Sequence, residues 1–231
     1  MSHRQKFLAI EGIDGAGKRT QMDMLCKLLD RRKLPYVRIS FPRYESFFGQ
    51  LVGRYLNGEF GPLDAVDPHF SALLYAGDRL EAKADLEESL LTRKLVLADR
   101  YIGSNLAHQT ARVPADRRKE FLNWLKQLEY EVYGLPAEDL VIYLRLPAAE
   151  AQRLVGQKAS RGYTKMKRDL QEANLAHLEQ AAQVYDRLAK ESNWATVECL
   201  SASGRLRPPE DIFRDILAAV EKHTEYLFER R

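Results

Sequence analysis

Short apolar runs alternate with longer amphipathic segments along this chain. The apolar runs are rich in residues that favour strands, and turn-forming residues bound them. We predict strands over residues 6–11, 36–40, 95–99, 140–146 and 195–200. We predict helices over residues 18–32, 46–57, 68–93, 115–133, 148–157, 168–191 and 209–229. Strands separated by helices imply parallel crossovers, so the pattern predicts an α/β fold with a five-stranded parallel sheet.

The carboxyl ends of the predicted strands carry polar and charged residues. In an open parallel sheet these ends share one edge, and ligands bind there. The ends of the first four strands read Glu11-Gly12, Ser40-Phe41-Pro42-Arg43, Asp99-Arg100-Tyr101 and Arg145-Leu146-Pro147. A purely structural loop has little use for such side chains, so we expect the functional site at this edge.

The first strand leads into a glycine-rich loop of the phosphate-binding kind. Gly12, Gly17 and Lys18 fill three fixed positions of the pattern G-x-x-x-x-G-K-[ST], and Arg19 stands where a hydroxyl residue is usual. The glycines let successive backbone N–H groups point at phosphate oxygens, with the positive end of the following helix behind them. We expect Lys18 to bridge the β- and γ-phosphates, and Thr20 to donate to a phosphate. The residues assigned to the nucleotide cofactor are Gly12, Ile13, Asp14, Gly15, Ala16, Gly17, Lys18, Arg19 and Thr20.

Size and composition narrow the class of protein. A chain of 231 residues suits one α/β domain, and we predict a single domain over residues 1–231. The formal net charge of +3 is too small to indicate a nucleic-acid partner. We expect the two cysteines, Cys26 and Cys199, to be core residues in a reducing compartment. No apolar run approaches the length of a membrane span, and no signal-like segment precedes the first strand, so we expect a cytoplasmic protein without a membrane partner.

Charged residues at the strand ends predict phosphoryl-transfer chemistry. Asp99 ends the third strand, where a carboxylate holds Mg²⁺ directly or through water. Asp14 inside the loop is a second carboxylate, so the metal can be held without a hydroxyl at position 19. Arg100 can clamp a phosphate with two N–H groups, and Arg43, beside Pro42, is placed to hold a second phosphate.

Four motifs closely resemble the signature of the thymidylate kinase family. They are the glycine-rich loop, Phe41-Pro42-Arg43, the segment Tyr75-Ala76-Gly77-Asp78-Arg79, and Asp99-Arg100-Tyr101 with Ser104-Asn105 and Gln109. They occur in the family's order, and Gly-Lys-Arg-Thr in the loop also occurs among these kinases. The resemblance extends to about Leu188. It implies a P-loop kinase fold of three α/β/α layers with a short basic lid. It also implies transfer of the γ-phosphate of ATP to thymidine monophosphate (dTMP), giving thymidine diphosphate (dTDP), with Mg²⁺ and usually in a homodimer.

The resemblance also implies roles for particular residues. Catalytic roles around the phosphates fall to Lys18, Asp14, Arg43 and Arg100, and metal binding falls to Asp99 and Asp14. The residues that would bind the acceptor nucleotide are Arg43, Tyr44, Tyr75, Arg79, Arg100, Ser104 and Asn105. Tyr75 would stack on thymine and Arg79 would hydrogen-bond the base, while Ser104 and Asn105 would read the base edge. Tyr75 and Arg79 are four positions apart on a predicted helix and therefore share one face.

Residues 156–168 form a segment with five cations and no carboxylate. Such a segment repels itself unless it is solvated or faces an anion. In a kinase with a phosphate-binding loop it resembles the lid that closes over ATP and supplies an arginine to the transferred phosphoryl group. Some thymidylate kinases carry that arginine inside the loop, where this chain has Gly15. We therefore assign the catalytic arginine to Arg161 or Arg168, with Lys165 third, and we expect Tyr163 to contact the nucleotide sugar.

Other functions stay open on the residues alone. A nucleoside kinase shares the loop and the lid but needs a carboxylate base near a hydroxyl, whereas Arg43, Arg79 and Arg100 favour a phosphate acceptor. Another nucleoside-monophosphate kinase is the next alternative, because base choice rests on few contacts. A GTP-dependent switch matches at Asp99-Arg-Tyr-Ile-Gly103 but lacks Asn-Lys-x-Asp. A protein that binds nucleotide without chemistry is the last alternative.

The assignment of the lid arginines can be tested by substitution. Arg161→Ala and Arg168→Ala are compared with the unmodified protein in steady-state turnover of ATP with dTMP. Loss of the arginine that faces the transferred phosphoryl group should lower kcat about 10³-fold or more, because its charge stabilises the transition state. Near-normal kcat in both variants would contradict the assignment.

Overall fold

The computed structural model describes residues 7–92, 95–155 and 174–223. Its sheet consists of the parallel strands β1 (Phe7–Glu11), β2 (Tyr36–Ser40), β3 (Leu95–Asp99), β4 (Leu140–Arg145) and β5 (Trp194–Glu198), in the order β2-β3-β1-β4-β5. The predicted five-stranded parallel sheet is therefore confirmed. The bounds of β2 and β3 agree fully with the prediction, while β4 ends one residue earlier and β5 is shifted toward the N-terminus.

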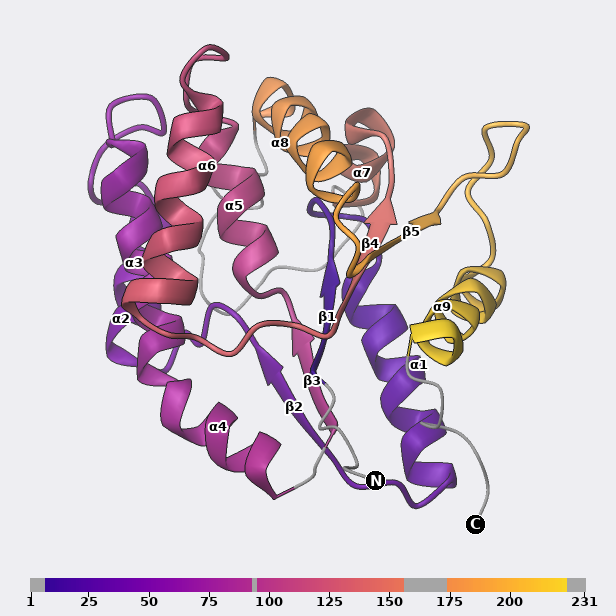
Figure 1. Cartoon of the computed structure of the whole chain (residues 1–231). Helices are drawn as coiled ribbons and strands as arrows, with labels where there is room; N and C mark the ends of the chain where they lie inside the picture. The colour runs from indigo at the N-terminus through magenta and orange to yellow at the C-terminus, as the bar shows by residue number, and fades with distance from the viewer. Residues whose placement is uncertain (1–6, 93–94, 156–173, 224–231) are drawn as a thin grey trace.

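Helices lie on both sides of this sheet (Figure 1). The helices are α1 (Lys18–Arg31), α2 (Phe47–Leu56), α3 (Pro68–Glu81), α4 (Lys83–Leu91), α5 (Ile102–Thr110), α6 (Arg118–Lys126), α7 (Ala148–Val155), α8 (Leu175–Leu188) and α9 (Pro209–His223), with a π-helical turn η1 (Gln127–Val132) after α6. Helices α1 and α9 pack together on one side, and α2 to α6 lie on the other. The result is the predicted α/β/α layering.

The structure corrects three helix predictions. The single helix expected over residues 68–93 is two, because at Ala82 the backbone N–H bonds to Arg79, three residues back, and the chain turns. The helix expected over residues 115–133 starts at Arg118 and becomes π-helical from Gln127. Helix α5 was not predicted at all. It contains glycine, serine, asparagine and histidine, which are weak helix formers, and it is buried on nearly every side, so it shows no amphipathic pattern.

Two apolar clusters hold the layers together. The larger one surrounds the sheet, where every residue of β1 is buried between β3 and β4. The smaller one lies between α2 and α3 and contains Val52, Tyr55, Leu56, Val66 and Leu74. Cys26 and Cys199 are buried and not cross-linked, as predicted.

The sheet order brings three functional strand ends together. Asp99 is in register with Ile10 of β1 on one side and with Ser40 of β2 on the other. The backbone beyond them is tied in the same way, because Phe41 N–H donates to the Asp99 carbonyl and Arg100 N–H donates to the Ile10 carbonyl, both at 3.1 Å. The predicted lid, residues 156–168, lies outside the described residues, as do parts of the helices predicted over residues 68–93, 148–157, 168–191 and 209–229. In the part of the chain that the structure describes, no helix has the length and apolarity needed to cross a bilayer.

Candidate functional site

The loop between β1 and α1 has the backbone that its glycines predict. Gly12, Gly15 and Gly17 have φ angles of 142°, 95° and 90°, values that residues with a side chain rarely adopt. The Lys18 side chain bends back over the loop, and its Nζ donates to the carbonyl oxygens of Gly12 (2.8 Å) and Ile13 (2.9 Å). The loop therefore forms a tight concave turn closed by one buried ammonium group.

Burial changes the chemistry of Lys18. Burial lowers its pKa from 10.5 to about 7, and the positive charge of Arg100 adds to this. Asp14, Asp99 and Glu11 oppose the change. An anion bound in the loop would favour the charged form, because it would supply the negative charge that a desolvated ammonium lacks.

Gly15 lies directly against helix α7. A Cβ atom at this position would lie 2.3 Å from the carbonyl oxygen of Ala151, and the φ of 95° already disfavours a side chain. An arginine at position 15 is therefore incompatible with this packing of α7. This is a physical reason for a catalytic arginine to come from outside the loop in this chain.

Arg100 links the loop to helix α5. Its Nη1 donates to the Gly12 carbonyl (3.1 Å) and to Ser104 Oγ (2.9 Å), and its Nη2 donates to Asp14 Oδ1 at 2.7 Å. Burial opposes its charge, but Asp14 and other nearby groups outweigh burial and raise its pKa. The residue has a φ of 68°, which is strained for a residue with a side chain. These contacts hold the guanidinium beside the phosphate-binding turn.

A buried carboxylate, Glu11, organises the contacts behind Arg100. Its Oε1 accepts from the backbone N–H of Tyr101 (2.7 Å) and Ser104 (3.0 Å) at the start of α5. Its Oε2 accepts from Ser104 Oγ (2.6 Å) and Tyr185 Oη (2.9 Å). A Cβ at position 103 would lie 3.0 Å from Glu11 Oε1, so the glycine there makes room for the carboxylate. The match of Gly103 to D-x-x-G thus has a packing explanation.

Asp78 holds Arg43 at the end of β2. The buried Asp78 carboxylate accepts from the Arg43 backbone N–H (2.8 Å), from Arg43 Nε (3.1 Å) and from Ser46 Oγ at 2.7 Å. Arg43 Nη2 also donates to the Asp78 carbonyl oxygen at 2.9 Å. Arg43 is partly exposed, so it can meet an anion while Asp78 holds its guanidinium group.

Two predicted base-binding residues, Arg79 and Asn105, share one carboxylate partner. Arg79 Nε and Nη2 donate to the two oxygens of Glu129, each at 2.6 Å, and all three side chains are buried. Asn105 Nδ2 donates to Glu129 Oε1 (2.8 Å) and to the Ala72 carbonyl oxygen at 3.0 Å. Burial opposes the Arg79 charge, but Glu129 outweighs it and raises the pKa of Arg79.

The remaining predicted residues are spread around this centre. Tyr44 and Tyr75 pack on the smaller apolar cluster, and Tyr75 meets Tyr55 edge-on at a ring distance of 6.3 Å. Arg19 and Thr20 are exposed in the first turn of α1. Arg161, Tyr163, Lys165 and Arg168 lie outside the described residues.

The two carboxylates predicted to serve the metal differ in their partners. Asp14 is paired with Arg100, whereas Asp99 lies 4.0 Å from Arg38. Their side chains are 18% and 16% exposed, so both reach solvent at the edge of the sheet. Within residues 7–92, 95–155 and 174–223 there is no cluster of three or more metal-ligating side chains. Mg²⁺ typically takes one or two protein carboxylates and completes its shell with phosphate and water.

Sequence reasoning assigned no role to three residues that hold the site together: Glu11, Glu129 and Tyr185. Glu11 and Glu129 interrupt an apolar pattern, which is the signal that was available, whereas Tyr185 fits the apolar pattern and gave no signal. Glu11 ends a fully buried strand, and Glu129 follows Leu125 by one helical turn on a face that packs inward. Tyr185 lies on the buried face of α8.

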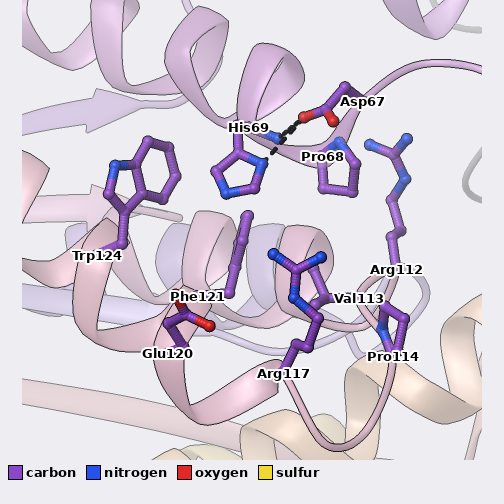
Figure 2. Close-up of a pocket in the computed structure, with 10 residues that line it drawn as sticks. All are labelled: Asp67, Pro68, His69, Arg112, Val113, Pro114, Arg117, Glu120, Phe121 and Trp124. Atoms are coloured by element: carbon purple, nitrogen blue, oxygen red, sulfur yellow. Dashed lines mark hydrogen bonds and ion pairs between the residues drawn. The ribbon is translucent and has the colours of Figure 1, made fainter.

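A separate cavity of about 250 Å³ lies between the start of α3 and α6 (Figure 2). His69, Phe121 and Trp124 form its aromatic wall, with ring centroids 4.6–5.3 Å apart. Arg112 in the opposite wall is held by Ser71, Gln109 and the Leu63 carbonyl. None of the predicted site residues that the structure describes lines this cavity.

The chain matches the family model described as thymidylate kinase over residues 10–205. It is 30% identical to a thymidylate kinase of Mycobacterium tuberculosis over 204 residues, which cover 87% of this chain and 94% of the relative. It is 26% identical to the thymidylate kinase of Plasmodium falciparum, covering 94% of this chain and 90% of that protein. The solved structure of thymidylate kinase from Candida albicans superposes with a TM-score of 0.72 at 20% identity, covering 95% and 92% of the two chains, which shows a shared fold.

The Glu11 contacts can be tested with two stacked tyrosines. Tyr185→Phe removes a hydrogen bond to a buried carboxylate and should lower the free energy of unfolding by about 1.5–3 kcal/mol. The control, Tyr143→Phe, removes a longer contact (3.3 Å) to the partly exposed Asp186 and should cost less than about 1 kcal/mol. Urea denaturation measures both. Equal stability of the two variants would show that Glu11 does not depend on Tyr185.

Proposed function

The chain belongs to the thymidylate kinase family, and from this we propose that the loop, the strand ends and helix α5 form the site of its reaction. The enzyme transfers the γ-phosphate of ATP to dTMP and gives dTDP. The observation that carries the assignment of the site is the convergence of Lys18, Asp14 and Arg100 on one turn of backbone. Positive groups fixed around a concave loop stabilise the charge of a transferred phosphoryl group without a covalent step.

The donor nucleotide binds along the loop in this proposal. Backbone N–H groups of residues 12–20 surround the phosphates, and Lys18 leaves its carbonyl contacts to meet the β- and γ-phosphates. The lid arginine, Arg161 or Arg168, then approaches the transferred group. Gly15 supports an arginine that comes from the lid and not from the loop, because α7 occupies the space that a loop arginine would need.

The acceptor nucleotide binds on the other side of Arg100, over α3 and α5. Arg43, held by Asp78, and Arg100 bind the acceptor phosphate, and Asp14 orients it. Tyr44 and Tyr75 offer ring surfaces, and Arg79 and Asn105 read the base. Ser104 contributes through Arg100, since its hydroxyl also contacts Glu11. Three arginines near an acceptor favour a phosphate over a sugar hydroxyl, which supports a monophosphate kinase over a nucleoside kinase.

Asp99 and Asp14 are the residues that would hold a magnesium ion at this edge of the sheet. Bound Mg²⁺ neutralises phosphate charge during transfer. Among the described residues, the Asp99 carboxylate has only a long contact to Arg38, so it is available as a ligand, directly or through water. We further propose a cytoplasmic homodimer. The apolar side chains of Phe70, Leu73 and Leu80 on α3 support the dimer, because each is at least 39% exposed, and sedimentation at working concentration tests it.

A coupled assay of ADP release tests the reaction. ATP turnover should depend on added dTMP, and dTMP should be preferred over the monophosphates of uridine, deoxycytidine and adenosine. This preference separates the enzyme from other monophosphate kinases. ATP turnover that ignores dTMP would contradict the kinase assignment.

The pKa of Lys18 predicts a proton linked to ATP binding. At about pH 8 the free enzyme holds Lys18 mostly neutral, because its pKa is about 7. Phosphate favours the charged form, so binding takes up a proton, and affinity for ATP weakens as the pH rises above the free-enzyme pKa. Calorimetry in buffers of different ionisation enthalpy measures this uptake. Lys18→Met is the control, since any uptake it retains belongs to ATP itself, and identical uptake in both proteins contradicts the role of Lys18.

A further inference from the structure

We infer that Glu129 is a positioning residue that sets base selectivity, because it fixes Asn105 as a hydrogen-bond acceptor and Arg79 as a donor toward the acceptor base. This inference rests on the proposed function and adds the reason why the site selects one class of base. Glu129 lies on η1 with its carboxylate fully buried, and its two described contacts are the two proposed base readers.

Helix α5 carries buried polar atoms without partners on one face. Among the described residues, four buried polar atoms of α5 have no hydrogen-bond partner: Asn105 Oδ1, His108 Nε2, Gln109 Nε2 and Thr110 Oγ1. The first three of these residues are at positions i, i+3 and i+4, so they share one side of the helix. Buried polar atoms are nearly always paired in folded proteins. Three orphaned atoms on one helical face therefore point to a ligand that pairs with them.

The orientation of the Asn105 amide follows from its partners. Nδ2 has two hydrogens, and they go to the Ala72 carbonyl and to Glu129 Oε1. Both partners accept only, so the reverse orientation would set Oδ1 against two acceptors. Oδ1 is therefore the atom left over, and it is an acceptor. Glu129 is one of the two acceptors that fix the orientation of the amide, and it is the charged one.

The side-chain amide of Gln109, one helical turn after Asn105, has the opposite orientation. Its Oε1 accepts from Ser71 Oγ (2.8 Å) and from Arg112 Nη1 (3.1 Å), which leaves Nε2 as the unpaired atom. Asn105 and Gln109 thus present one acceptor and one donor on the same face of α5. Arg79 adds a donor from α3, because a guanidinium has no acceptor and Glu129 occupies only Nε and Nη2.

This arrangement suits a base with an N–H group beside a carbonyl oxygen. Thymine and uracil have that edge: N3–H donates to Asn105 Oδ1, and the neighbouring carbonyl accepts from Arg79. Cytosine has a bare N3 and an amino group, so both contacts become repulsive. A buried site that loses a hydrogen bond to the wrong base rejects that base strongly. The substrate class is therefore the monophosphates of 4-oxo pyrimidines.

The test compares kcat/KM for dTMP and for deoxycytidine monophosphate. In Glu129→Gln an amide N–H must face an N–H of Arg79 in either orientation, so the fixed arrangement is lost. The ratio of the two kcat/KM values should fall about tenfold or more, mainly through KM for dTMP. The matched control is Glu131→Gln, which changes an exposed carboxylate two residues away and should keep the ratio within about twofold.

The outcomes separate this inference from the proposed function. If the unmodified enzyme does not phosphorylate dTMP, the proposed function fails. If it does and a folded Glu129→Gln keeps the ratio within about twofold, the role of Glu129 is wrong. Folding is checked by thermal melting, because removing one partner of a buried ion pair is costly.

If Glu129→Gln does not fold, the variant Asn105→Asp tests the role of Glu129 instead. In Asn105→Asp the new carboxyl faces the charged Glu129 on η1, Arg79 on α3 and the Ala72 carbonyl. Only its protonated form donates to Glu129 and leaves an acceptor for the base. The pKa of the new carboxyl is raised by burial and by Glu129, so kcat/KM for dTMP should be retained at low pH and fall as the carboxyl ionises. A pH profile parallel to that of the unmodified enzyme would overturn the inference.

Discussion

The site depends on a buried carboxylate, Glu11, at the end of the central strand. A buried charge is costly unless hydrogen bonds replace the lost water. Glu11 receives four such bonds, two from the backbone at the start of α5 and two from the hydroxyls of Ser104 and Tyr185. Because these donors come from β3–α5 and from α8, one side chain determines where both segments lie relative to the phosphate-binding loop. Arg100, held by Ser104, takes its position from the same network.

A similar arrangement recurs where we propose that the acceptor nucleotide binds. Asp78 holds Arg43, and Glu129 holds Arg79 and Asn105. Buried ion pairs of this kind add little net stability, because desolvation offsets most of the attraction. Their contribution lies in geometry: each carboxylate fixes a cation at a defined place before any substrate arrives. Preorganised charge of this kind is what phosphoryl transfer and base recognition require.

Elements of the fold could be predicted where burial produces a simple apolar or amphipathic pattern in the sequence. They could not be predicted where burial removes that pattern. The strands β1, β3 and β4 were found because strands covered on both faces read as apolar runs. Helix α5 was not predicted, because burial on nearly every side removes the amphipathic pattern. The predicted loop has the expected glycine geometry, but Glu11 and Glu129 were missed as partners, since their contacts join residues far apart in the chain: Glu11 meets Tyr185 across 174 positions. Such pairings depend on tertiary packing, which local sequence does not describe.

Gly15 joins the loop to the remainder of the site in a way that sequence alone only suggested. Sequence placed the catalytic arginine in the basic segment because the loop lacks one. The structure adds a steric cause: the carbonyl of Ala151 in α7 lies where a side chain at position 15 would start. Helix α7 ends at Val155, directly before the basic segment. The helix that excludes an arginine from the loop is thus the one that leads into the segment with Arg161 and Arg168, where the sequence predicts the catalytic arginine.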